Sequence, residues 1–122
     1  MRAVTVYKCF CDVTRLRILN LLGNGPLCVC HLQEILQEPQ VKVSKHLSYL
    51  KLNELVECKR RANWSIYSIS QKRNAILTQN LKCLQDLANE EPVFRADLRQ
   101  LKKTDTSAAC QPTTKSKTCC SQ

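Results

Sequence analysis

Two cysteines with one residue between them, Cys28 and Cys30, are the side chains in this sequence best suited to bind a soft ligand. Thiolate sulfur is the donor that soft centres prefer, and trivalent arsenic, cadmium, lead and zinc share this preference to different degrees. A C-x-C pair is not surprising by itself in a chain with nine cysteines, so its weight comes from its location. The pair stands at the start of a segment in which Val29, Leu32 and Ile35 recur at helical spacing, which predicts a helix with one buried side.

A ligand shared by Cys28 and Cys30 sets a geometric condition. Residues two apart in a regular helix project about 200° from each other. We therefore expect a shared ion to unwind or distort the first helical turn. The donors open for a third bond are Cys58, the neighbours His31 and Gln33, and the tail cysteines Cys110, Cys119 and Cys120. The three tail thiols are alternatively a separate site of their own.

The remaining cysteines favour structural roles. Cys9 and Cys11 form a second C-x-C pair, but the aromatic neighbours Tyr7 and Phe10 indicate helix packing. Cys83 lies on the apolar stripe of a later helix and is expected at a subunit interface. In a reducing compartment these thiols are expected as free cysteines or metal ligands rather than as disulfides.

The elements that must position these groups begin with two apolar-striped segments separated by Glu38-Pro39-Gln40. In the second segment Val43, Leu47 and Leu50 form the stripe, and the other positions are polar and basic. Two helices joined by a few residues, the second with a basic outer face, are typical of a helix-turn-helix. The residues of this second helix expected to contact base edges or phosphates of DNA are Gln40, Lys42, Ser44, Lys45 and His46.

From Leu55 the apolar period changes to two, which predicts paired strands at Val56–Arg61 and Trp64–Ile69. A helix-turn-helix followed by such a hairpin is a winged helix. The hairpin tip, expected along the DNA backbone or in the minor groove, contains Lys59, Arg60, Arg61 and Asn63. The chain carries a net charge of +9, and residues 40–73 hold eight basic and two acidic side chains. A basic patch of this kind attracts phosphate.

The flanking segments predict four further helices. A short helix is expected over residues 3–11, a second over Val13–Leu22 with Asp12 as its N-cap, and a third that Ser70 caps. Pro92 suits the first turn of a last helix at Val93–Lys102. The helix after Ser70 has an apolar face wider than one small core requires, which indicates packing against a second subunit.

The 122 residues suffice for one domain with short extensions. We expect a mainly α fold with a small β-hairpin over residues 1–90, a C-terminal helix over 91–103, and a disordered, cysteine-containing tail over 104–122. No apolar run approaches the length of a membrane span, and the N-terminus lacks the apolar core of a signal peptide. The expected location is cytoplasmic, without a membrane partner.

Four blocks of this sequence carry a family resemblance. They are Asp12–Leu19, Leu27–Leu32, Gln40 with Val43–Leu47, and Leu55-Val56 leading to Arg60-Arg61 and Trp64. In their order and spacing the chain resembles the ArsR/SmtB family of winged-helix metalloregulators, and within it the arsenical-resistance repressors. The resemblance covers residues 5–90 approximately.

The resemblance implies a homodimeric repressor whose terminal helices form the dimer interface and whose winged helix binds an inverted-repeat operator in double-stranded DNA. It implies no obligatory cofactor, and an inducer, As(III) or Sb(III), that binds cysteine thiolates and releases transcription of a resistance operon. The family's arsenic motif is matched by Cys28-Val29-Cys30-His31-Leu32. Here His31 replaces the usual acidic residue, and Gln33 replaces the third cysteine.

Two alternatives keep the same fold. One senses Cd, Pb, Zn or another soft metal ion, and the other senses thiol oxidation through disulfide formation. A thiol enzyme such as an arsenate reductase is disfavoured because the chain has no C-x-x-C and its two glycines both precede Pro26. A metal-scavenging protein would not need the basic helix and hairpin.

Overall fold

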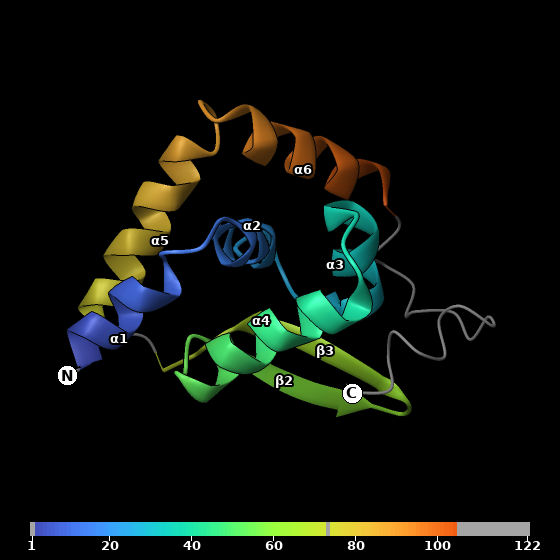
Figure 1. Ribbon diagram of the computed structural model, residues 1–122, viewed down its shortest axis with the longest axis horizontal. Coiled ribbons are helices and arrows are strands. Elements are labelled where there is room, and N and C mark those ends of the chain that lie inside the picture. The colour runs from blue at the N-terminus through green and yellow to red at the C-terminus, as the bar shows by residue number, and fades with distance from the viewer. Residues whose placement is uncertain (1, 73, 105–122) are drawn as a thin grey trace.

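The computed structural model describes residues 2–72 and 74–104, which form six helices and three strands (Figure 1). In chain order they are α1 (Arg2–Cys9), α2 (Val13–Leu22), β1 (Leu27–Cys28), α3 (Val29–Leu36), α4 (Gln40–Leu52), β2 (Val56–Arg61), β3 (Trp64–Ile69), α5 (Ala75–Leu87) and α6 (Pro92–Lys103). The predicted mainly helical fold with a small β-hairpin is confirmed. The tail cysteines Cys110, Cys119 and Cys120 lie outside the described residues, so the expectations for them stay predictions.

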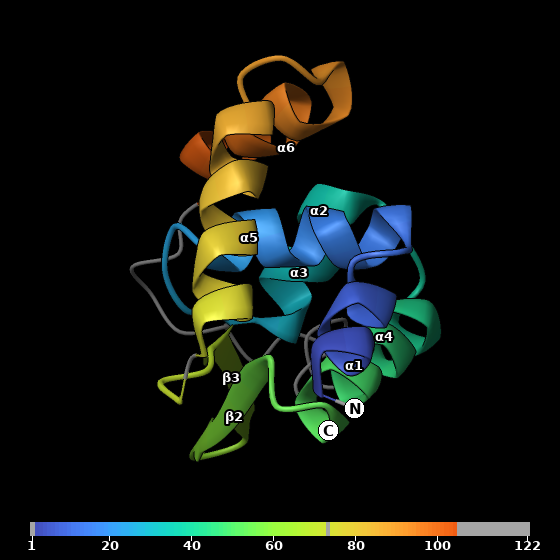
Figure 2. The ribbon, with the colours of Figure 1, turned by 90° about the vertical axis from the view of Figure 1, so that its left-hand side faces the viewer.

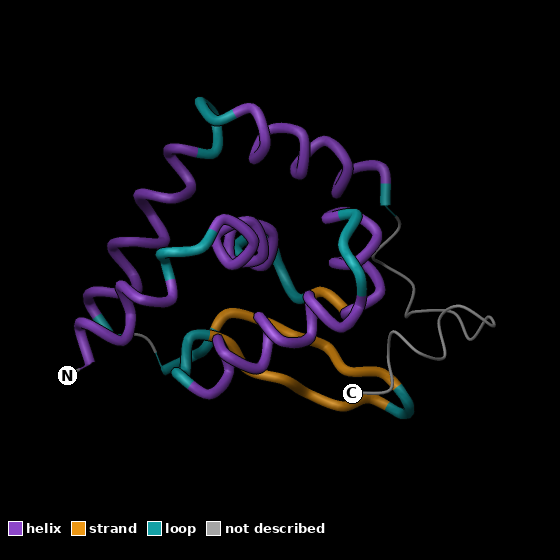
Figure 3. Tube along the Cα trace, viewed as in Figure 1, coloured by secondary structure: helices purple, strands orange, loops and turns teal. Residues whose placement is uncertain are grey.

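Helix α2 runs through the middle of the molecule, and Figures 1 and 3 look along its axis. Asp12 caps it as predicted, because its Oδ1 accepts the backbone N–H of Arg15 at 3.1 Å. Helices α3, α4, α5 and α6 all contact α2. As a result Ile18, Leu19 and Leu21 are completely buried and form the centre of the hydrophobic core.

The small sheet has the strand order β1-β3-β2, with both pairs antiparallel. The hairpin strands have the predicted bounds, and Ala62 at the turn between them takes a left-handed backbone (φ 55°). Strand β1 was not predicted, because two residues are too short for a periodic pattern. Its pairing of Cys28 with Ile66 attaches the start of α3 to the hairpin.

Helix α5 starts later than the sequence indicated. Its N-cap is Asn74, whose side chain accepts the N–H of Leu77 at 2.8 Å. The predicted cap, Ser70, instead accepts the N–H of Lys72 in a local turn at 3.2 Å. The prediction of Ser70 as the N-cap was therefore wrong, because its hydroxyl is used before the helix begins.

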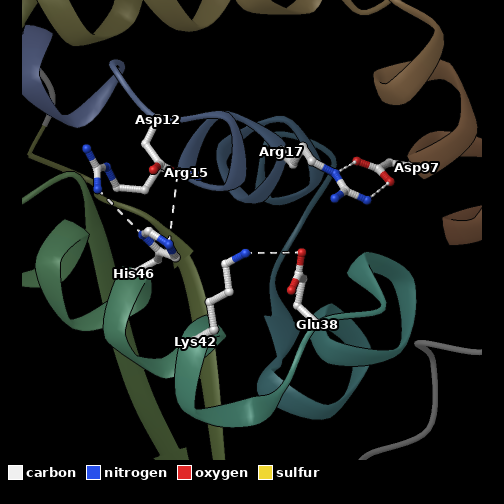
Figure 4. A network of polar contacts seen from close by, with 7 residues as sticks. All are labelled: Asp12, Arg15, Arg17, Glu38, Lys42, His46 and Asp97. Carbon is white, nitrogen blue, oxygen red and sulfur yellow. Dashed lines mark hydrogen bonds and ion pairs between the residues drawn. The ribbon is translucent and has the colours of Figure 1, made fainter.

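Helix α6 packs across α2 and α3 on the side away from the sheet (Figures 1 and 2). Arg17 of α2 donates from Nε and Nη2 to the two carboxylate oxygens of Asp97 on α6, both at 2.8 Å (Figure 4). Asp97 is only 3% exposed, so this bidentate ion pair is largely desolvated. Together with buried Phe94 it fixes α6 to the domain.

Helices α1 and α5 contact each other and both face the viewer in Figure 2. Their exposed apolar side chains include Val4, Tyr7 and Leu87. Such a surface suits the predicted homodimer, which stays a prediction. Among the described residues, no helix is long and apolar enough to cross a membrane.

Candidate functional site

The cysteine pair lies at the junction of β1 and α3, and only one of its members is helical. Cys28 is the N-cap of α3 in extended backbone (φ −81°, ψ 156°), and its Sγ accepts the N–H of Cys30 at 3.3 Å. The two sulfur atoms therefore converge, and the structure joins them as a disulfide. The assumption behind the expected distortion, that both cysteines are helical, was wrong, because Cys28 precedes the first helical residue. The expectation of thiols rather than disulfides also differs from the structure at this pair.

His31 completes a cluster of three ligand-bearing side chains. One ligand atom each from Cys28, Cys30 and His31 lie within 4.8 Å of one another. Within residues 2–72 and 74–104 this is the one group of three or more His, Cys, Asp or Glu side chains close enough to hold an ion. In the reduced state of the pair, two sulfurs suit arsenic, and two sulfurs with an imidazole nitrogen suit zinc or cadmium.

Cys58, a candidate third donor, lies on the other face of the sheet. It pairs with Tyr67 across the β2–β3 ladder, whereas Cys28 pairs with Ile66. Successive residues of a strand point to opposite faces, so the side chains of Cys58 and Cys28 point away from each other. Burial and the Cys58 thiol raise the pKa of Tyr67 to about 12. Cys58 therefore belongs to the packed core side and not to the cysteine pair.

On its own face of the sheet, the cysteine pair contacts an apolar surface. Cys30, Trp64 and Ile66, all half-buried, pack against Cys28 in a small cluster separate from the main core. Cys28 is 1% exposed, while Cys30 remains half-buried. The site thus has an apolar wall on one side and an accessible sulfur on the other.

The other described cysteines have local roles. Cys9 is fully buried in the core, and burial raises the pKa of its thiol against the opposing charge of Arg15. Cys11 is exposed and its thiol donates to the carbonyl of Tyr7 at 3.1 Å. Cys83 is exposed on α5. The packing role of Cys9 is confirmed, and an interface role for Cys83 stays a prediction.

Helix α4 has a buried and an exposed side, as the sequence indicated. Val43, Leu47 and Leu50 are fully buried against the core. The opposite side forms an open depression of about 370 Å³ lined by Gln40, Val41, Ser44, Lys45 and Ser48. Lys42 is also exposed and its Nζ lies 3.3 Å from Glu38 Oε1. Polar and basic side chains thus share one surface of this helix, although the hydroxyl oxygen of Ser44 itself is buried.

His46 lies at one side of that surface, where it lines a second open depression with Arg15, Lys42, Lys45 and Tyr49. Its Nδ1 lies 3.5 Å from Arg15 Nη1 and its Nε2 lies 3.9 Å from Asp12 Oδ1, so the ring faces α2 (Figure 4). Burial lowers the pKa of His46, and the charge of Arg15 lowers it further against the opposing effect of Asp12. The DNA contact expected of His46 stays a prediction. The position of His46 supports a role in joining α4 to α2.

Arg15 is a residue whose role the sequence analysis missed. Its Nε and Nη2 donate to the carbonyls of Cys9 and Lys8 at the end of α1, both at 3.0 Å. Its guanidinium also lies 4.6 Å from the ring centroid of Tyr49 on α4. Arginine side chains commonly satisfy the last carbonyls of a helix, which is the signal that could have found it. Arg15 therefore ties α1 and α4 to the start of α2.

The hairpin tip carries the predicted basic groups at its surface. Lys59, Arg60, Arg61 and Asn63 are all exposed. The ladder pairs Lys59 with Ile66 and Arg61 with Trp64, so these two cations lie on the same face as the cysteine pair. Figure 1 shows the hairpin extending beyond the helices. The thiol cluster and part of the basic hairpin are thus neighbours across one small sheet.

Comparison with known proteins places these features in context. A family model described as bacterial regulatory protein, arsR family, matches residues 12–57. An uncharacterized HTH-type transcriptional regulator of Methanocaldococcus jannaschii is 40% identical over 73 residues, which are 59% of this chain and 82% of that protein. The arsenical resistance operon repressor of Staphylococcus aureus is 36% identical over 88 residues, covering 66% of this chain and 85% of the repressor.

A solved structure is also similar. HlyU from Vibrio cholerae superposes with a TM-score of 0.64 at 28% identity, covering 70% of this chain and 90% of that chain.

Proposed function

The chain belongs to the arsR family of bacterial regulatory proteins, and from this premise we propose that it represses an arsenical-resistance operon until As(III) or Sb(III) binds Cys28 and Cys30. The family and the fold are those of DNA-binding transcriptional regulators and not of enzymes. The observation that carries the proposal is the convergence of both sulfurs at the start of α3, on the sheet face shared with the basic hairpin.

The binding chemistry requires the reduced pair. Arsenite, As(OH)3, exchanges two hydroxyl groups for the two cysteine sulfurs and releases two water molecules, without a change in oxidation state. The sulfurs need little rearrangement because they already lie next to each other at the N-cap of α3. His31 adds a nitrogen donor that suits a divalent ion more than arsenic.

For DNA binding we assign α4 to the major groove and the hairpin to the backbone or minor groove. Gln40, Ser44 and Lys45 line the exposed depression of α4, and Lys42 lies beside it. Amide and ammonium groups of this kind pair with purine edges, while hydroxyl and basic groups also hold phosphates. A homodimer joined through its terminal helices would present two such helices to an inverted-repeat operator.

Two connections could carry the effect of the ligand to DNA. Strand β1 joins Cys28 to Ile66 and so to the hairpin. The short segment after α3, in which Gln37 takes a left-handed backbone, joins the same helix to α4. An inducer that prefers the conformation unable to contact DNA lowers the affinity for the operator. Bound operator lowers the affinity for the inducer by the same factor.

Operator binding by fluorescence anisotropy tests the proposal. The wild type is measured with and without arsenite and antimonite, under a phosphine reductant, beside Cys28→Ser with Cys30→Ser. A coupling of about 1–3 kcal/mol, or roughly 5-fold to 150-fold weaker operator binding, is expected for the wild type only. A full-length Cys110→Ser, Cys119→Ser, Cys120→Ser variant should respond like the wild type. If this variant alone becomes unresponsive, the sensor lies in the tail.

The disulfide between Cys28 and Cys30 favours a second candidate function, sensing of thiol oxidation. A hydroperoxide would convert the two thiols to the disulfide and itself become an alcohol and water. Under this alternative, operator release follows peroxide treatment, is reversed by the phosphine, and does not require arsenite.

A further inference from the structure

Trivalent arsenic forms three bonds, and the described part of this site offers two sulfurs. The group at the start of α3 contains Cys28, Cys30 and His31, and no other cysteine among residues 2–72 and 74–104 joins it. Cys58 lies on the opposite face of the sheet, and Cys9 is buried in the main core. The donor set therefore satisfies two of the three bonds with sulfur.

The environment of the sulfur pair indicates what suits the third bond. Trp64 and Ile66 pack against Cys28, as Cys30 itself does. A hydroxyl group held against these side chains would lose hydrogen bonds to water, whereas a carbon substituent would gain apolar contact. The apolar side chains of Trp64 and Ile66 thus favour arsenic that already carries an organic group.

We propose that the preferred inducer is a trivalent arsenical with one carbon substituent, and this inference rests on the function proposed above. Such a compound, R–As(OH)2, has two exchangeable hydroxyl groups, which match the two thiols. Two As–O and two S–H bonds break, two As–S bonds form, and two water molecules leave. The As–C bond and the oxidation state of arsenic are unchanged, and the substituent R contacts Trp64 and Ile66.

His31 distinguishes this ligand from its main competitor. Two sulfurs, an imidazole and a water molecule form a donor set that zinc accepts. Because the organoarsenical needs no nitrogen, His31→Gln should weaken zinc binding at least several-fold and leave organoarsenical binding within about twofold. Loss of both ligands in this variant would contradict the separate roles.

The single tryptophan of the chain provides a direct readout, because Trp64 itself packs against Cys28. Full-length protein under a phosphine reductant is titrated with phenylarsine oxide, methylarsonous acid and arsenite while Trp64 fluorescence is recorded. Thiols are counted before and after binding. We expect phenylarsine oxide to bind roughly tenfold or more tightly than arsenite, with methylarsonous acid between them, since binding should follow the apolar area buried. Each organoarsenical should consume two thiols per chain.

Two full-length variants test which residues make organoarsenicals bind more tightly than arsenite. Ile66→Ala should weaken phenylarsine binding about threefold to tenfold while arsenite binding changes less than about twofold. A purely structural effect would weaken both ligands alike. The Cys110→Ser, Cys119→Ser, Cys120→Ser variant should retain the wild-type preference. If Ile66→Ala does not fold, the comparison of methyl and phenyl arsenicals in the wild type still tests whether the substituent contacts apolar side chains.

The outcomes separate the two proposals. Arsenite binding as tightly as phenylarsine oxide, or consuming three thiols, overturns the organoarsenical preference while arsenite release of the operator still supports the proposed function. Loss of binding in the tail variant likewise overturns the two-sulfur site. If no arsenical releases the operator from the wild type, the proposed function itself fails.

Discussion

Helices α2 and α3 each begin with a residue whose side chain accepts a backbone N–H, but the capping atoms and the sequence spacing differ. Asp12 accepts the N–H of Arg15 through a carboxylate oxygen at 3.1 Å, and Cys28 accepts the N–H of Cys30 through sulfur at 3.3 Å. Both capping residues have extended backbone. The carboxylate is held by charged neighbours, whereas the sulfur is also a donor for soft ligands.

The two helix starts also connect to different parts of the DNA-binding surface. Around Asp12, Arg15 and His46 join α2 to α1 and α4 (Figure 4). Around Cys28, the β1–β3 ladder joins α3 to the hairpin. The start of α2 is thus a fixed support for α4, whereas the start of α3 is the place where we propose that a ligand acts. Three stability predictions examine this difference, beginning with the largest effect.

Arg15→Ala should destabilise the domain by about 2 kcal/mol. The change removes hydrogen bonds to Cys9 and Lys8 and the contact with Tyr49, each contributing about 0.5–1.5 kcal/mol. Chemical denaturation measures the free energy of unfolding. The control Arg95→Ala removes an exposed arginine of α6 and should stay within about 0.5 kcal/mol of the wild type. Equal effects of the two changes would contradict a supporting role for Arg15.

Asp12→Ala should cost about 1 kcal/mol, the usual value of a lost N-cap. Cys28→Ser should cost less, because serine is itself a good capping residue. The same denaturation experiment compares them, with Asp12→Asn as the matched control that keeps a capping oxygen. If Cys28→Ser lowers the free energy of unfolding more than Asp12→Ala does, the role of Cys28 is packing of its sulfur rather than ligand binding.

His46 should give the smallest effect, a pH dependence of stability. Its pKa in the folded protein is lowered by burial and by Arg15, so below the ordinary value of 6.5 the unfolded chain binds the proton first. Stability is therefore full above pH 6.5 and declines as the pH falls through the folded-state pKa. In His46→Gln the thermal unfolding midpoint should change less between pH 7 and pH 5 than it does in the wild type. An unchanged slope in His46→Gln would refute the assignment.

The sequence predicted the elements with strong local signals. The bounds of α2 follow from Asp12 and the glycines after Leu22, and the hairpin strands follow from period-two alternation. The cysteine pair was identified, but its geometry was not, because one residue decides whether Cys28 is helical. Strand β1 depends on a partner 38 residues away in sequence, Ile66, which no local pattern reveals.

The orientation of His46 could have been read from spacing. It follows Val43 by three residues and precedes Leu50 by four, so it lies beside the buried stripe of α4. The basic composition of its neighbours suggested a DNA contact, which stays a prediction. The exclusion of Cys58 from the cysteine pair needed the strand register, which the sequence did not specify.

Exchanging the cap of α3 for that of α2 tests the central claim most directly. Cys28→Asp retains a side-chain oxygen at the N-cap but removes one of the two sulfurs, and operator affinity is measured by anisotropy with and without arsenite. The account predicts operator binding within about threefold of the wild type, about 0.6 kcal/mol, and no release by arsenite. Release of Cys28→Asp at the arsenite concentration that releases the wild type would contradict the claim that the Cys28 sulfur is the switch.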